Sequence, residues 1–251
     1  MSKFISKQSV AIWYALTALL ATFLVGQVIL WFFPDGRSMW TSLLFILMNL
    51  IPLIVAAVFS LVLSEVNSLG EFFKKVFLQK ESSLSWILAF FIPVIYYGIS
   101  ILLMNVRFTG NSLLAFFIYF PWTLLYGGLE EVGWRWFLQD HLSYSKHFIP
   151  KMMLLSIVWF LWHIPIYQLP WITAGSSNYL IFYLMILGNT FLFGALKEYS
   201  KGAVPCILAH MLIDSLAVLM LIQSSLPQII LLVIFEILVA SWLVAARKSE
   251  K

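Results

Sequence analysis

Eight stretches of about 20 predominantly apolar residues follow one another along the 251-residue chain, and they constrain its fold more than any motif does. Hydrophobic residues make up 62% of the chain and charged residues only 10%, which lies outside the range of soluble domains. We therefore predict an all-α, polytopic membrane helix bundle of about eight transmembrane helices. The expected spans are 10–33, 40–63, 84–104, 113–137, 152–169, 179–196, 203–222 and 226–246.

Basic residues indicate the orientation, because short loops rich in lysine and arginine stay on the cytoplasmic side. An N-terminus inside the cell leaves only Arg37 and Arg107 on the outer side. Both termini are then cytoplasmic, and we expect a single integral-membrane domain over 1–251 in the cell membrane. The cytoplasmic set is Lys3, Lys7, Lys74, Lys75, Lys80, Lys146, Lys151, Lys197, Lys201, Arg247, Lys248 and Lys251.

The net charge of +4 reflects this topology, and no basic stripe with interleaved aromatics indicates nucleic-acid binding. The first span is too long for a cleaved signal segment, so we expect it to be retained. The longest polar interruption, 64–83, mixes charges with phenylalanines. That pattern favours an amphipathic helix on the cytoplasmic face.

Five of the ionisable residues within the expected spans stand out: Glu130, Glu131, Arg135, His163 and His210. Such groups cost roughly 2.5 to 3.5 kcal/mol each on insertion scales, so their presence indicates a function. Glu131 and Arg135 are spaced i,i+4 with the acid first, which favours a structural ion pair. Glu130 has no local cation and is the better candidate for a general base. Adjacent helical residues point about 100° apart, so the two carboxylates cannot share one partner in one direction, and we expect them to have different roles.

Gly127, Gly128 and Gly133 flank the glutamates and would permit close approach of a neighbouring helix or of a substrate. His210 and Asp214 form another i,i+4 pair on one helical face. Counting about 1.5 Å per residue from the expected helix ends brings Glu130, His163, His210 and Asp214 to compatible depths. We therefore expect one cavity, open toward the cytoplasm, to hold all four.

Three ordered motifs carry a family resemblance: Glu-Glu-x-x-x-Arg, a histidine with an aromatic residue four positions earlier, and His-x-x-x-Asp, on separate spans. The chain resembles the CPBP family of CaaX-processing and bacteriocin-processing (Abi) intramembrane endopeptidases over about 121–215, the expected catalytic region. Two positions depart from the family pattern. Trp159 stands where phenylalanine is usual, and Asp214 stands where the prenyl-protein proteases have asparagine.

The resemblance implies that a membrane-associated peptide or protein, prenylated or bacteriocin-like, is hydrolysed within the bilayer. Glu130 and His163 would activate a water, while His210 and the residue at 214 would stabilise the oxyanion. An ionised Asp214 cannot donate a hydrogen bond, so it must be protonated, orient His210 or bind a cation. The favoured mechanism needs no cofactor. The alternative uses zinc or another divalent metal on Glu130, His163 and His210.

Three further interpretations stay open. Asn189, at the level of Glu130, either supports the site or bonds a neighbouring helix. Cys206 is a less favoured nucleophile, and it is expected to act as a small packing residue. A transporter or a non-enzymatic membrane immunity protein is the alternative from another functional class, with the buried charges serving proton relay or partner binding.

Overall fold

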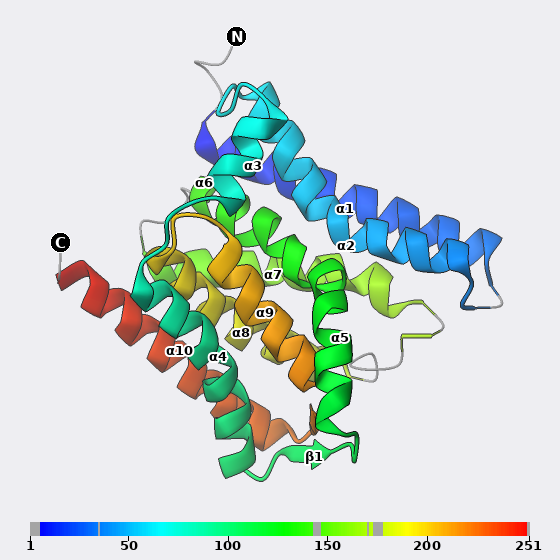
Figure 1. Cartoon of the computed structure of the whole chain (residues 1–251), viewed down its shortest axis with the longest axis vertical. Coiled ribbons are helices and arrows are strands. Elements are labelled where there is room, and N and C mark those ends of the chain that lie inside the picture. The colour runs from blue at the N-terminus through cyan, green and yellow to red at the C-terminus, as the bar shows by residue number, and fades with distance from the viewer. Residues whose placement is uncertain (1–5, 35, 143–146, 170, 173–177, 250–251) are drawn as a thin grey trace.

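The computed structural model describes residues 6–34, 36–142, 147–169, 171–172 and 178–249 as a helical bundle (Figure 1). The all-α prediction is confirmed apart from two three-residue strands. The long helices are α1 (Lys7–Phe32), α2 (Met39–Val62), α4 (Ser83–Leu102), α5 (Leu113–Tyr126), α7 (Phe148–Tyr167), α8 (Tyr179–Tyr199) and α10 (Leu226–Ser249). The shorter elements are α3 (Leu69–Phe77), α6 (Gln139–His141), α9 (Val204–Leu216), β1 (Val106–Phe108) and β2 (Met220–Ile222).

Among the described residues, seven helical segments are long and apolar enough to cross a membrane. The chain is therefore a multi-pass integral membrane protein. Each of the seven coincides with one of the expected spans, and the segment for the fourth runs from Leu113 to His141. Large hydrophobic side chains such as Trp31 and Trp242 lie exposed on these helices, as expected of surfaces that face lipid.

The seventh expected span, 203–222, is wrong in its extent. Helix α9 ends at Leu216 after only 13 residues. Three successive turn hydrogen bonds, the last from the Leu219 N–H to the Leu216 carbonyl, then lead the chain directly into β2. Apolar composition continues through β2, so nothing in the local composition marks this change. Strand β2 pairs antiparallel with β1, with Arg107 opposite Leu221.

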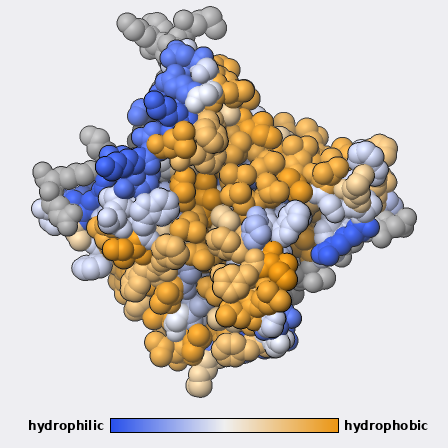
Figure 2. Space-filling model, viewed as in Figure 1, coloured by the Kyte–Doolittle hydropathy of each residue, from blue (hydrophilic) through white to orange (hydrophobic). Residues whose placement is uncertain are grey.

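The two ends of the bundle differ in character. At one end, the backbone N–H groups of Lys201 and Gly202 donate to the Glu81 carboxylate. The loop after α8 is thus tied to the segment after α3. Figure 2 shows hydrophobic side chains over most of the visible face, while hydrophilic ones gather mainly at this α3 end. The β1–β2 sheet lies at the opposite end.

Helix α3 forms within the expected amphipathic segment. Ser68 caps its N-terminus by accepting from the Glu71 N–H at 3.1 Å. Phe72 and Val76 are buried on one face, whereas Phe73 is exposed. The Asn67 backbone N–H and the Lys75 ammonium both bind the Glu71 carboxylate and lower its pKa to about 2. The charged face therefore keeps its ion pair at neutral pH.

The fourth span is helical along its length but irregular where it carries the glutamates. Helix α5 ends at Tyr126, a 3-10 turn (η1) covers Gly128–Glu130, and a π-helical segment (η2) covers Val132–Leu138 before α6. Wider π-helical turns change the direction in which side chains project. The glutamates consequently do not follow the regular 100° spacing assumed from the sequence.

Candidate active site

The Glu130 carboxylate is buried, with 2% of the residue exposed. Its Oε2 accepts hydrogen bonds from two indole N–H groups, Trp134 at 3.0 Å and Trp159 at 3.2 Å. Its other oxygen, Oε1, lies 3.6 Å from Nε2 of His210. That distance is too long for a direct hydrogen bond, so Oε1 is available to another hydrogen-bonding partner. The two indoles fix the carboxylate in one orientation.

Glu131 is fully buried and binds two partners at once. Its Oε2 accepts from Nε of Arg135 at 2.8 Å, which is the ion pair expected from the sequence. Its Oε1 lies 2.8 Å from Nδ1 of His210. The two glutamates therefore approach opposite nitrogens of the same imidazole. Their hydrogen-bond partners differ, although the 3-10 and π-helical turns bring both carboxylates toward α9.

The Arg135 guanidinium is also fully buried and lies against aromatic rings. Its central carbon is 4.7 Å from the Trp159 ring centre and 5.5 Å from that of Phe193. Its two terminal nitrogens make no hydrogen bond within the described part of the structure. Cation–π contacts therefore accompany the single ion pair that holds this charge. Arg135 stabilises Glu131, and Glu131 in turn fixes the ring of His210.

His210 and Asp214 extend from the same face of α9, as their spacing predicts. Asp214 Oδ2 is 3.5 Å from His210 Nε2. Because Nδ1 is directed to Glu131, Nε2 is the nitrogen that faces both Glu130 and Asp214. Asp214 is the more accessible group, with 34% of its side chain exposed. Of the roles open to Asp214, this geometry favours orientation of His210.

Glycines allow α9 to approach the glutamate segment closely, as the sequence predicts. A methyl group at Gly127 would overlap Asp214 Oδ2 and lie 3.1 Å from His210 Nε2. A methyl group at Gly128 would lie 2.8 Å from the Met211 side chain. Both glycines thus leave room for the residues of α9.

We expect Gly127→Ala to lower activity at least about tenfold and to destabilise the fold by roughly 1–3 kcal/mol, because the new methyl displaces Asp214 and His210. Peptide cleavage and thermal unfolding in detergent measure the two effects. Gly98→Ala is the matched control, since nothing lies within 4 Å of a methyl group there. Equal behaviour of the two variants would contradict the close packing at Gly127.

His163 lies on α7 with its Nδ1 2.7 Å from the Trp159 carbonyl oxygen. An Nδ1–H donor in this bond leaves Nε2 as the acceptor nitrogen. Trp159 contacts both histidines of the site, since its ring centre is 5.5 Å from that of His163 and 5.7 Å from that of His210. The sequence marked Trp159 only as a departure from the family. Its indole N–H, which phenylalanine lacks, is a second donor to Glu130.

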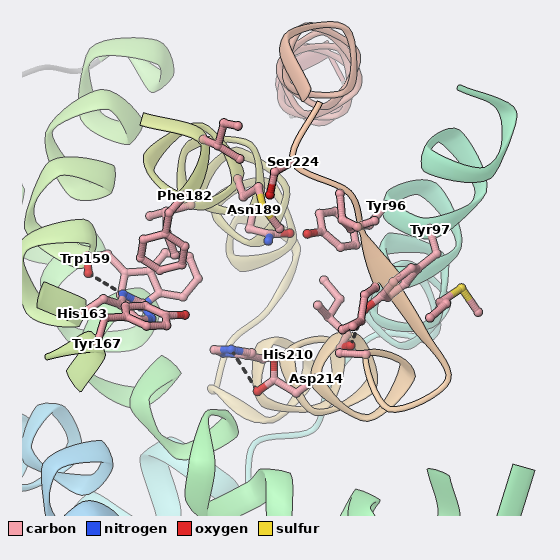
Figure 3. Close-up of a pocket in the computed structure, with 18 of the residues that line it drawn as sticks. Tyr96, Tyr97, Trp159, His163, Tyr167, Phe182, Asn189, His210, Asp214 and Ser224 are labelled. Atoms are coloured by element: carbon pink, nitrogen blue, oxygen red, sulfur yellow. Dashed lines mark hydrogen bonds and ion pairs between the residues drawn. The ribbon is translucent and has the colours of Figure 1, made fainter. Parts of the chain in front are cut away.

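A cavity of about 280 Å³ lies beside these residues and is lined by His163, His210, Asp214 and Asn189. Figure 3 shows His163 and His210 on different walls, with Asn189 grouped with Tyr96 and Ser224. The Asn189 side chain lies next to that of Tyr96. Both supporting roles considered for Asn189 thus remain predictions.

The cavity runs toward the sheet end of the bundle. Its lining includes Asn178 at the start of α8, all of β2, and Ser224. Asn178 and Ser224 are exposed at this end of the cavity, whereas Phe193 and Trp159 are buried at its other end. The described lining does not reach the basic α3 end, so the expected opening toward the cytoplasm stays a prediction. The expected depths assumed a long seventh span, but α9 is short and Asp214 lies only two residues from its end.

Two other buried groups lie outside this cavity. Cys206 is fully buried, and its thiol faces the Phe193 carbonyl oxygen at 3.8 Å, which agrees with a packing role. Glu236 on α10 is also fully buried, and neither carboxylate oxygen has a partner within the described residues. A methyl group at Gly188 would overlap Glu236, so α8 and α10 pack closely at this point.

The zinc alternative requires three ligands arranged around one point. Among the described residues, no group of three or more histidine, cysteine, aspartate or glutamate side chains has such an arrangement. Glu130 Oε2 is already bound by two indoles. The donors as arranged therefore do not fit a three-ligand metal site.

Buried carboxylates and histidines at the centre of a helical membrane bundle indicate a functional site. The family comparison agrees: residues 112–216 match the model of the type II CAAX prenyl endopeptidase Rce1-like family. The matched segment, about two fifths of the chain, contains all three motifs, so the comparison confirms the resemblance. The match supports an intramembrane protease. A search of the curated proteins found no match to it.

Proposed function

We propose that the protein is an intramembrane endopeptidase that cleaves a membrane-associated CaaX-type peptide by glutamate-based hydrolysis without a metal. The observation that carries this proposal is the placement of Glu130. Two indole donors hold one oxygen, while the other faces His210 Nε2 at 3.6 Å. A fixed, buried carboxylate with one available oxygen is suited to accept a proton from water.

In this mechanism, Glu130 Oε1 takes a proton from a water that attacks the scissile carbonyl carbon. His163, with Nε2 as its acceptor nitrogen, helps to position that water. His210 Nε2–H donates to the oxygen of the tetrahedral intermediate, and Asp214 orients this N–H. The proton on Glu130 then passes to the leaving amine.

The cavity walls indicate the kind of substrate. Tyr96, Tyr97, Tyr167, Ile181 and Phe182 are among the lining residues, and the described lining contains no lysine or arginine. Aliphatic side chains suit such walls, as in the two aliphatic positions of a CaaX sequence. We propose that the protein acts on peptides of this kind in the cell membrane, with the basic α3 end in the cytoplasm.

Comparison of membrane proteomes tests the function even before a substrate has been identified. Cells producing Glu130→Gln in place of the wild-type protein should accumulate one or more uncleaved precursors, detected as peptides that span the cleavage site. Wild-type protein should cleave such a precursor after purification and reconstitution. Identical proteomes, together with an unchanged phenotype, would instead indicate a non-enzymatic role such as immunity or transport.

A further inference from the structure

Strand β2 has one edge that pairs with β1 and one edge that pairs with no other strand among the described residues. The Gln223 N–H donates to the Asn105 carbonyl at 2.8 Å, and the Thr109 N–H donates to the Leu219 carbonyl at 3.0 Å. Hydrogen-bonded and non-hydrogen-bonded pairs alternate along an antiparallel ladder. Residues 219, 221 and 223 therefore face β1. Met220 and Ile222 direct their N–H and carbonyl groups to the other side.

The free edge of β2 borders the cavity. Successive side chains of a strand point to opposite faces, so a cavity beneath one face would contact only alternate residues. All three residues of β2 line this cavity, whereas Val106, Arg107 and Phe108 of β1 are not part of its described lining. This pattern places the cavity along the strand edge opposite β1.

Unpaired backbone groups beside a cavity are stabilised by a hydrogen-bonding partner, because each N–H and carbonyl is a strong donor or acceptor. The cavity walls are mainly aromatic and aliphatic. Across the cavity, the Asn189 residue is nine-tenths buried and its side chain lies next to that of Tyr96. An occupant with backbone donors and acceptors would satisfy such groups.

The strand edge also lies close to the candidate catalytic residues. Asp214 and Met220 line the same cavity, and only five residues separate them. The turn hydrogen bonds at Ala217, Val218 and Leu219 keep that connection compact. An extended peptide advances about 3.3 Å per residue, so a few residues suffice to reach from β2 to His210.

We propose that the free edge of β2 binds the substrate backbone as an added strand and so holds the peptide extended across the cavity. Strand addition supplies main-chain hydrogen bonds, while the walls receive alternate side chains. An extended backbone also exposes the scissile carbonyl, which a helical substrate would keep in its own hydrogen bonds. This inference rests on the proposed function, and it assigns β2 the role of positioning the peptide.

Proline substitution on β2 tests the inference, because proline removes one N–H and is tolerated on a strand edge. Ile222→Pro removes an N–H that faces the cavity and no bond to β1. Ile222→Val is the matched control, since it keeps both the N–H and a branched side chain. The assay follows cleavage of a quenched fluorescent peptide with a prenylated CaaX terminus in proteoliposomes, and thermal unfolding confirms that each variant is folded.

We expect Ile222→Pro to lower kcat/KM about tenfold and Ile222→Val to remain within about threefold of wild type. Folded Ile222→Pro with wild-type kcat/KM, alongside inactive Glu130→Gln, would overturn strand addition and leave the proposed function intact. Cleavage by Glu130→Gln at the wild-type rate would overturn the proposed function itself.

A second measurement uses the unaltered protein and does not depend on the folding of a variant. Single N-methyl groups are placed along the substrate peptide, each blocking one backbone N–H. Strand addition predicts large losses of cleavage at alternate positions and smaller losses between them, because only every second N–H faces β2. Losses without this period of two would contradict the inference.

Discussion

Glu130→Gln is expected to reduce peptide cleavage by about 10³-fold or more while the protein remains folded. Glutamine has nearly the same shape and can keep contact with Trp134 and Trp159 through its amide oxygen. It cannot accept a proton from water at neutral pH, so the loss would be specific to the chemical step. Single-turnover cleavage in proteoliposomes, with thermal unfolding measured in parallel, separates catalysis from stability.

Asp140→Asn is the control for this prediction. Asp140 is half-exposed, and it pairs with Lys197 at 3.1 Å away from the site. We expect its cleavage rate to stay near that of wild type. Asp214→Asn provides a further contrast, because it introduces the amide found in the prenyl-protein proteases and should retain substantial cleavage. Substantial activity in Glu130→Gln would exclude Glu130 as the base.

Arg135→Met is expected to destabilise the protein by about 3–5 kcal/mol, the largest effect on stability that we predict. Arg135 and Glu131 form a fully buried ion pair, with Arg135 Nε 2.8 Å from Glu131 Oε2. Removal of the cation leaves the buried Glu131 carboxylate without its main partner. Methionine fills much of the same space, so loss of charge dominates the change. The midpoint of thermal unfolding in detergent measures it.

Lys75→Met tests the same i,i+4 arrangement at the surface, where the pair with Glu71 is partly exposed. We expect almost no change in its unfolding temperature. The double variant Glu131→Gln/Arg135→Met should recover part of the loss, because it removes the unpaired charge. If the unfolding midpoint of Arg135→Met equals that of wild type, the buried ion pair does not stabilise the fold.

The long helices were predictable because a membrane requires lengthy apolar segments, and each of the seven coincides with an expected span. The extent of α9 was not predictable, since residues 217–222 are as apolar as the helix before them. Its early end depends on pairing between β2 and β1, which lie more than 100 residues apart. Such long-range contacts leave no periodic signal in a local stretch of sequence.

The motifs identified the ionisable residues, and the structure brings Glu130, Glu131, His210 and Asp214 together while His163 lines the same cavity as His210. The bond between Glu131 and His210 was missed, because it depends on the irregular turns after Gly127. Trp134 and Trp159 were missed as donors to Glu130. Their spacing of four residues from Glu130 and His163 was the available signal, but aromatic residues are common throughout such a chain.

The most direct test of glutamate-based hydrolysis is the metal content of the active, purified protein, measured together with cleavage before and after chelation. We predict that cleavage persists when zinc and other divalent metals are removed and that it is lost in Glu130→Gln. One metal ion per chain, lost together with activity on chelation and restored with it when the metal is returned, would contradict the mechanism.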